Sequence, residues 1–146
     1  MIATFQSALI EHLQATGLNV KEYFGEFDRP EQAKIFKTFL PGVMVDFVEA
    51  KPDELYRENV TFSLYIAHVT YSAQEQLRSE TNVSLLDYIF GIRQSLMRVS
   101  VGGSDPINVI KYKKIFDAAK DSAYLNVYLM TITATLYNQT INEEIA

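Results

Sequence analysis

The sequence predicts an α+β domain, in which an antiparallel sheet of four or five strands has two helices packed on one of its faces. Apolar residues recur at helical spacing in two segments, and they alternate with polar residues or form short β-branched runs in the others. The helical segments are 2–16 and 82–99, and the strand-like segments are 43–50, 58–72 and 107–137. Because no linker or internal repeat separates these elements, we expect one domain over residues 1–136 and a short polar tail over residues 137–146.

The first helix carries an apolar stripe on one face, and Gly17 supplies its C-terminal stop. The stripe consists of Ile2, Phe5, Leu9 and Leu13. Residues 19–27 follow as a short strand or an extended arm. The next segment, EQAKIFKTF at residues 31–39, is compatible with one helical turn or with a strand, and its pattern does not decide between them.

Two carboxylates, Asp46 and Glu49, interrupt the apolar strand that follows the turn at Pro41 and Gly42. Side chains alternate between the two faces of a strand, so residues three apart point in opposite directions. Asp46 and Glu49 therefore do not form a carboxylate pair, and we expect both to be dispensable for chemistry. The expected buried face holds Val43, Val45 and Phe47, and the other face holds Met44, Asp46 and Val48. A loop at residues 51–53 is expected to end the strand.

The clearest strand, over residues 58–72, alternates an apolar face with a more polar one. The core face is expected to hold Val60, Phe62, Leu64 and Ile66, and the other face Thr61, Ser63, Tyr65 and Ala67. His68 continues the apolar register as a hydrogen-bonded residue at the strand end. A zinc site needs three or four ligands, and His12 on the first helix is the only other histidine, so no metal site is predicted.

A polar stretch over residues 71–80 is predicted to be a long exposed loop before the second helix. The apolar stripe of that helix is expected to consist of Leu85, Leu86, Ile89, Ile92 and Leu96. Gly91 disfavours a helix interior, so we expect it to allow a close approach to the sheet. The sequence VGGSDP at residues 101–106 lacks the Gly-Lys-Ser/Thr sequence of a nucleotide-binding loop and is expected to be a turn.

The last third is predicted to be a long β-hairpin with arms at residues 107–118 and 124–137. The second arm is apolar on both faces, which is typical of a central strand or of one covered by a partner. On this basis we expect Tyr128, Met130 and Ile132 on a second face with room for neighbours. The only basic cluster consists of Lys111, Lys113 and Lys114, and it is expected to mark a solvated strand face or a protected edge.

Composition excludes several functional classes. The chain has 146 residues and a net charge of -5, which argues against specific nucleic-acid binding. It has no Cys, so disulfides, thiolate metal sites and a Cys nucleophile are excluded. No uninterrupted apolar run is long enough to span a membrane, and the N-terminal residues lack the basic region of a signal peptide. No motif pairs a nucleophile with a base, so the sequence predicts neither an enzyme nor a cofactor.

The order of these elements resembles a family of phage tail proteins. An N-terminal helix, the strand LPGVMVDFVEA, the strand VTFSLYIAHV, the helix SLLDYIFGIRQSLM and a hairpin ending in YLNVYLMTITATL are together similar to the minor tail proteins of Mu-like phages and to tail terminators, over residues 2–136. The resemblance implies a structural protein of the virion tail that is made in the host cytoplasm. Such subunits form a homo-oligomeric ring, commonly a hexamer, which caps the tail tube, contacts head-completion proteins and helps to join the head.

Subunit contacts are expected from two polar segments, residues 71–80 and 137–146, and from the outer face of the sheet. The candidate interface residues are Tyr71, Leu77, Arg78, Tyr128, Met130, Tyr137 and Ile141. Isolated apolar anchors in a polar segment are typical of contacts, and an Arg can pair with a carboxylate of a neighbour. The alternative functions are a monomeric protein-binding or regulatory domain, which would bury the same residues internally, and a small hydrolase.

Overall fold

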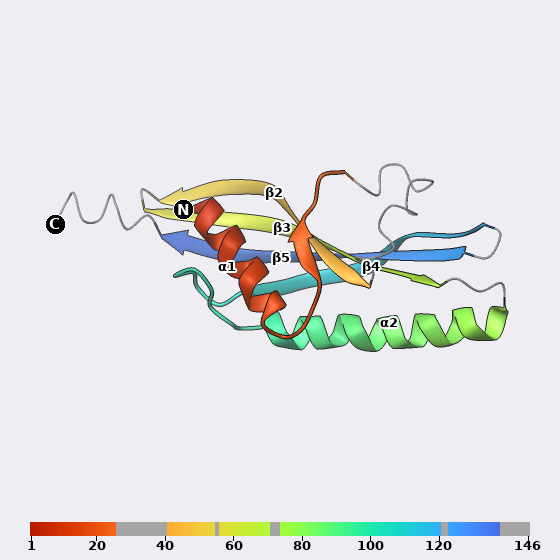
Figure 1. Cartoon of the computed structure of the whole chain (residues 1–146). Coiled ribbons are helices and arrows are strands. Elements are labelled where there is room, and N and C mark those ends of the chain that lie inside the picture. Colours follow the sequence, from red (N-terminus) through yellow and green to blue (C-terminus); the bar gives the residue numbers. More distant parts are fainter. Residues whose placement is uncertain (26–40, 55, 71–73, 121–122, 138–146) are drawn as a thin grey trace.

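Two helices and five strands make up the part of the chain that this computed structural model describes, namely residues 1–25, 41–54, 56–70, 74–120 and 123–137. In chain order they are α1 (Ile2–Gln14), β1 (Val20–Glu22), β2 (Gly42–Glu54), β3 (Arg57–Thr70), α2 (Glu75–Leu96), β4 (Asn108–Lys120) and β5 (Ala123–Tyr137). The strands form one sheet in the order β1-β2-β3-β5-β4, and both helices pack on one face of it (Figure 1). The predicted α+β class is confirmed, whereas the segments 31–39 and 138–146 lie outside the described residues.

The sheet is mixed, so the prediction of a purely antiparallel sheet is wrong at one edge. β1 runs parallel to β2, with Val20 opposite Val43, and the other three strand pairs are antiparallel. Parallel neighbours need a crossover connection of about a dozen residues or more, and the chain between these two strands is long enough. Alternation of side chains predicts which faces are buried but carries no information on strand direction. The sequence therefore located this short strand without indicating how it pairs.

The first helix, α1, forms as predicted and ends at a left-handed glycine. Phe5, Leu9 and Leu13 are fully buried, and Gly17 adopts φ +88° just after the helix. Gly102 allows the turn after α2 to pack closely against α1. A Cβ added at this position would lie 3.2 Å from the Phe5 Cα and 3.3 Å from the Ala8 Cβ. The predicted turn at residues 101–106 thus holds α1 at close range.

The second helix, α2, begins earlier than the sequence predicted. It starts at Glu75, so residues 75–80 are helical and the prediction of a loop there is wrong. This stretch lacks an apolar stripe, but Glu, Gln and Arg favour helices without one. Leu85, Ile89, Ile92 and Leu96 are buried as predicted, whereas Leu86 is exposed. Gly91 is also exposed, with open space around it, so the expected close approach to the sheet is not there.

One face of the sheet, here called the helix-covered face, packs against α1 and α2 (Figure 1). Its fully buried strand residues include Val43, Val45, Val60, Phe62, Leu64, Ile66 and Met130. The Phe62 ring lies 5.3 Å from the Phe5 ring, which joins the sheet to α1. His12 joins the two helices, because its Nε2 atom lies 2.9 Å from the carbonyl oxygen of Ser95.

The opposite face has a smaller apolar cluster of its own. We call it the helix-free face because neither of the two described helices packs on it. Met44, Ala67, Leu125 and Val127 are buried there, and Tyr23, Tyr65, Val69 and Phe116 pack around them. The Tyr23 and Tyr65 rings stack at 4.0 Å. The two apolar faces of β5 were compatible with a central strand or with a strand covered by a partner, and the structure shows a central strand, since β5 lies between β3 and β4. Within the described residues, neither helix has the length and apolar character needed to cross a lipid bilayer.

Candidate interaction surfaces

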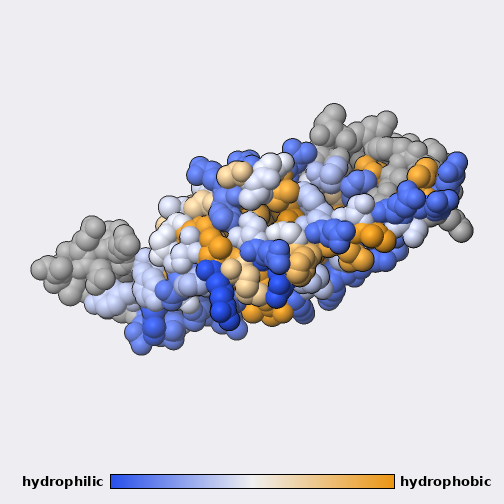
Figure 2. All heavy atoms as spheres, turned by 90° about the horizontal axis from the view of Figure 1, so that it is seen from below, coloured by the Kyte–Doolittle hydropathy of each residue, from blue (hydrophilic) through white to orange (hydrophobic). Residues whose placement is uncertain are grey.

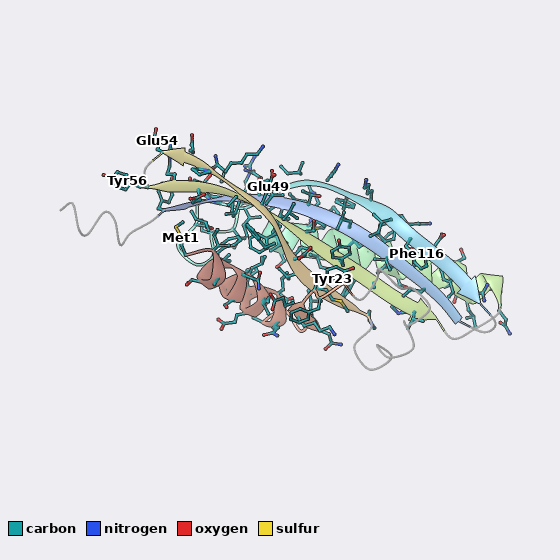
Figure 3. The ribbon with its side chains drawn as sticks, turned by 90° about the horizontal axis from the view of Figure 1, so that it is seen from above. Met1, Tyr23, Glu49, Glu54, Tyr56 and Phe116 are labelled. Carbon is teal, nitrogen blue, oxygen red and sulfur yellow. The ribbon has the colours of Figure 1, made fainter. Side chains whose placement is uncertain are left out.

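A β-bulge in β2 changes how its two central carboxylates are placed. Asp46 lies opposite Ser63 and Glu49 lies opposite Thr61, with the register shift at Val48 between them. Ser63 and Thr61 share one face of β3, so Asp46 and Glu49 share the helix-free face. The prediction that the strand separates them is wrong, because one inserted residue reverses the alternation of all residues that follow. Figure 3 shows Glu49 on the face turned toward the viewer, away from the helices.

The part of β2 beyond its pairing with β1, residues 46–54, is rich in acidic residues. β1 pairs only with residues 43–45 of this strand, and the predicted loop at residues 51–53 is part of the strand. The segment carries Asp46, Glu49, Asp53 and Glu54 against Lys51 alone. Glu49 lies 3.6 Å from Lys51, and Arg57 of β3 contacts both Asp53 and Glu54 at 3.2 and 2.9 Å. We call residues 46–54 the β2 edge.

The opposite edge of the sheet, β4, is basic. It carries Lys111, Lys113, Lys114 and Lys120 against Asp117 alone. The predicted protected edge is confirmed in position, since β4 is the terminal strand and its described lysines are exposed. A bulge at Ile115 places Lys114 and Asp117 on the same face, where they form a 3.2 Å ion pair that raises the pKa of Lys114. We call residues 108–120 the β4 edge.

Aliphatic side chains occupy most of the bulges on these two edges. The shifted positions are Val48 and Asp53 in β2, and Ile110 and Ile115 in β4. Val48, Ile110 and Ile115 are 51%, 56% and 40% exposed. Bulges at a sheet edge interrupt the regular ladder of backbone groups and so hinder uncontrolled strand addition. Both edges therefore present apolar side chains without presenting a regular backbone ladder.

A third apolar surface runs along the outer side of α2. Val83, Leu86 and Phe90 follow one another at three- and four-residue spacing, and each is about half exposed. The Arg93 guanidinium lies 5.7 Å from the centre of the Phe90 ring. Figure 2, which views the molecule from the side of α2, shows hydrophobic patches divided by charged residues. We call Val83, Leu86 and Phe90 the α2 stripe.

A polar network lies between the N-terminal half of α2 and the far end of the sheet. Asn126 of β5 is almost fully buried and donates to Asn82 of α2 at 2.5 Å. The Tyr124 hydroxyl donates to Asp117 of β4 at 3.3 Å. His68 lies directly across from Asn126, and burial lowers the pKa of His68. These polar contacts link α2 to β5 and β5 to β4 beyond the end of the apolar core.

The predicted interface residues are spread over different surroundings. Tyr128 and Met130 are buried on the helix-covered face, so the expectation of an outer, second face is wrong for both, as it is for Ile132. Their even-numbered register in β5 matches Phe62 and Leu64 of β3, which face the helices. Alternation alone cannot say which of two apolar faces a helix will cover.

The remaining predicted interface residues lie on the ends of elements. Leu77 is exposed near the start of α2, and the Arg78 guanidinium lies 5.7 Å from the centre of the Tyr124 ring. Tyr137 ends β5, and its hydroxyl donates to the Asp105 carboxylate at 2.7 Å, which raises the pKa of Tyr137. Tyr71 and Ile141 lie outside the described residues. No single surface unites the five predicted interface residues that the structure describes.

One contact resembles a catalytic pair but has the wrong protonation. The Ser95 hydroxyl lies 3.2 Å from His12 Nε2, which is within reach of a nucleophile and its base. The same nitrogen lies 2.9 Å from the Ser95 carbonyl oxygen, which can only accept a hydrogen bond. Nε2 therefore carries the proton and donates it, so it has no lone pair with which to activate the hydroxyl. The contact is a link between the two helices.

An open pocket of about 660 Å³ lies beside the start of β4. Its described lining consists of Asn59, Arg98, Asp105, Pro106, Asn108, Thr133, Ala134 and Thr135. Arg98 has a positive φ of 61°, and Thr135 donates to Asn59 at 2.8 Å. This lining lacks a histidine or lysine to act as a base, and its one carboxylate already accepts the Tyr137 hydroxyl. Among the described residues, no group of three metal-ligating side chains comes together.

Comparison with known proteins adds no family assignment, since no family model and no curated protein sequence matches this chain. The surfaces described above therefore stand on the structure alone. Sequence reasoning missed the exposed bulge residues Val48, Ile110 and Ile115. The available signal was two apolar residues in succession, as in Phe47-Val48 and Ile115-Phe116, where strict alternation breaks.

Proposed function

We propose that this chain is a structural protein of a tailed phage, a prophage or a tail-like particle, and that it acts as a tail terminator. In this role, copies of the chain form a ring that caps the tail tube and provides a surface for joining the head. The proposal involves no catalytic step and no cofactor. It extends the resemblance in the order of helices and strands, which the α+β architecture of the described residues supports.

The observation that carries this proposal is the amount of apolar side chain left on the surface of the described subunit. Val48, Ile110 and Ile115 are exposed on the sheet edges, and the α2 stripe is exposed on the helical layer. Exposed apolar patches on a small domain mark contact surfaces, and a ring subunit needs at least two of them. A monomeric binding domain needs only one such surface.

The proposal is tested on particles from cells that carry the gene. Deleting the gene should give tails of uncontrolled length that fail to join heads, as seen by electron microscopy. The chain itself should be detected in purified tails by mass spectrometry, and a tagged copy should label one end of the tail in immunogold images. Tails of normal length in the deletion strain would contradict the assignment as a terminator.

A further inference from the structure

We infer that residues 75–84 of α2 open from the sheet as a unit while the rest of the helix stays packed. We call these residues the N-terminal segment of α2. Opening uncovers polar side chains of β3 and β5 that lie beneath the segment. The inference concerns a motion within one subunit, so it does not depend on the proposed function.

The boundary of the segment is set by the place where apolar contact with the sheet begins. Leu85, Ile89, Ile92 and Leu96 are buried in the main core. Among the described side chains of α2, none before Leu85 belongs to either apolar cluster, and Val83 is 58% exposed. Packing of an apolar face supplies most of the stability of a helix in a protein. The helix has this support from Leu85 onward, and the N-terminal segment lacks it.

The contacts described between this segment and the sheet are polar. The Asn82 side chain accepts a hydrogen bond from Asn126 at 2.5 Å and donates one to the Tyr124 hydroxyl at 3.4 Å. The Arg78 guanidinium lies 5.7 Å from the centre of the Tyr124 ring. When exposed, these polar groups form hydrogen bonds with water instead, so the net stabilisation from each bond is small, and it is smaller still at 3.4 Å. The closed segment is therefore held weakly.

The closed arrangement also buries two polar atoms that have no hydrogen-bond partner among the described residues. They are the Nδ1 atom of His68 and the Oδ1 atom of Asn126. The two residues lie opposite each other on β3 and β5, and Asn126 is 1% exposed where Asn82 contacts it. A buried polar atom without a hydrogen bond destabilises the state that buries it. Opening of the segment lets water reach these atoms and removes that cost.

The opening ends at Leu85, because this side chain is 2% exposed and would have to leave the core. Local opening below the free energy of global unfolding is typical of regions with few buried apolar contacts. Figure 1 shows the N-terminal end of α2 near the end of β4 and the start of β5, far from α1. The segment is thus a strap over one end of the sheet, and it opens without disturbing α1 or the main core.

Hydrogen exchange of the full chain, resolved by residue with NMR, tests the opening. The first amides of a helix lack acceptors within it, so the comparison begins at residue 79. Protection factors of the amides of residues 79–84 should be at least about tenfold lower than those of residues 92–96. Equal protection in the two stretches would overturn the inference.

The variant Asn82→Ala distinguishes opening of a unit from simple fraying of a helix end. Alanine favours a helix more than asparagine does, so a fraying end would become better protected. Because the change removes the partner of Asn126, we expect the opposite result, about tenfold faster exchange over residues 79–84 and no change over residues 92–96. Ser79→Ala is the matched control, since it raises helix propensity at an exposed position of the same segment and should not speed exchange.

The converse variant combines Asn82→Leu with Asn126→Leu, which replaces the polar pair by apolar groups of similar size. Exchange over residues 79–84 should then slow toward the rate of residues 92–96. The single change Asn82→Ala is at a partly exposed position, so it decides the question even if the double variant does not fold. Exchange in Asn82→Ala that is no faster than in Ser79→Ala would refute the strap.

Discussion

Both faces of the sheet contain fully buried side chains, but different structures bury them. On the helix-covered face, Phe62 and Leu64 pack under α1 and α2 as part of the large core. On the helix-free face, Met44 and Ala67 are just as inaccessible, and the stacked rings of Tyr23 and Tyr65 lie beside them. Among the described residues, the difference is that two helices pack on the first face, whereas strand side chains and Tyr23 pack around the cluster on the second. Tyrosine rings on neighbouring strands can close a small cluster.

The strongest test of this comparison is at the centre of the helix-covered face. Phe62→Ala should lower the free energy of unfolding by about 3–5 kcal/mol, because it removes a buried ring that contacts Phe5 and Phe47. Thr61→Ala, on the next residue and the other face, is the control and should change stability by about 0.5 kcal/mol or less. Urea unfolding followed by circular dichroism measures both.

The matching test on the helix-free face is Met44→Ala. Met44 is fully buried in this small cluster, with three other buried side chains and four partly buried ones. We therefore expect a loss of unfolding free energy near the lower end of the usual range, about 2 kcal/mol. Val48→Ala, a nearby exposed residue of the same strand, serves as the control. If Met44→Ala and Val48→Ala lower the free energy of unfolding by the same small amount, the apolar cluster on the helix-free face contributes nothing to stability.

Two glycines test how the helical layer is attached. Gly102→Ala should cost about 1–3 kcal/mol, because φ is +54° and the new Cβ would press on the backbone of Phe5. Gly91→Ala should instead add about 0.5–1 kcal/mol, since this exposed position in α2 has open space around it. The melting temperature should fall for Gly102→Ala and rise for Gly91→Ala if the turn packs against α1 as the structure shows.

The smallest expected effect is a pH dependence at the polar end of the helix-covered face. Burial lowers the pKa of His68 below 6.5, so the folded state disfavours the protonated ring. The unfolded state therefore binds a proton first, and stability falls as the pH drops from about 6.5 toward the folded pKa. His68→Leu should flatten this part of the curve of unfolding free energy against pH, and an unchanged slope would assign the dependence to another group.

The fold class, the two apolar faces of β5 and both helices could be predicted because each depends on local patterns. The apolar stripe of Leu85, Ile89 and Ile92 is enough to identify α2. Its early start was missed because residues 75–80 are helical by propensity alone. The bulges at Val48 and Ile115 were missed because a one-residue insertion leaves only a brief break in alternation. The candidate edges follow from those bulges and from pairing across the sheet, which one sequence does not reveal.

The position of β5 between β3 and β4 has a consequence for the kinetics of folding. β3 pairs with β5 along its whole length, from Arg57 opposite Tyr137 to Thr70 opposite Tyr124, across the intervening α2 and β4. Closing so long a loop before any of its contacts form slows folding. β5 is also synthesised after every other described strand. During translation, the edges of β3 and β4 that later pair with β5 therefore stay unpaired. The acidic segment of β2 and the basic strand β4 become parts of one sheet only when this central strand pairs with both β3 and β4.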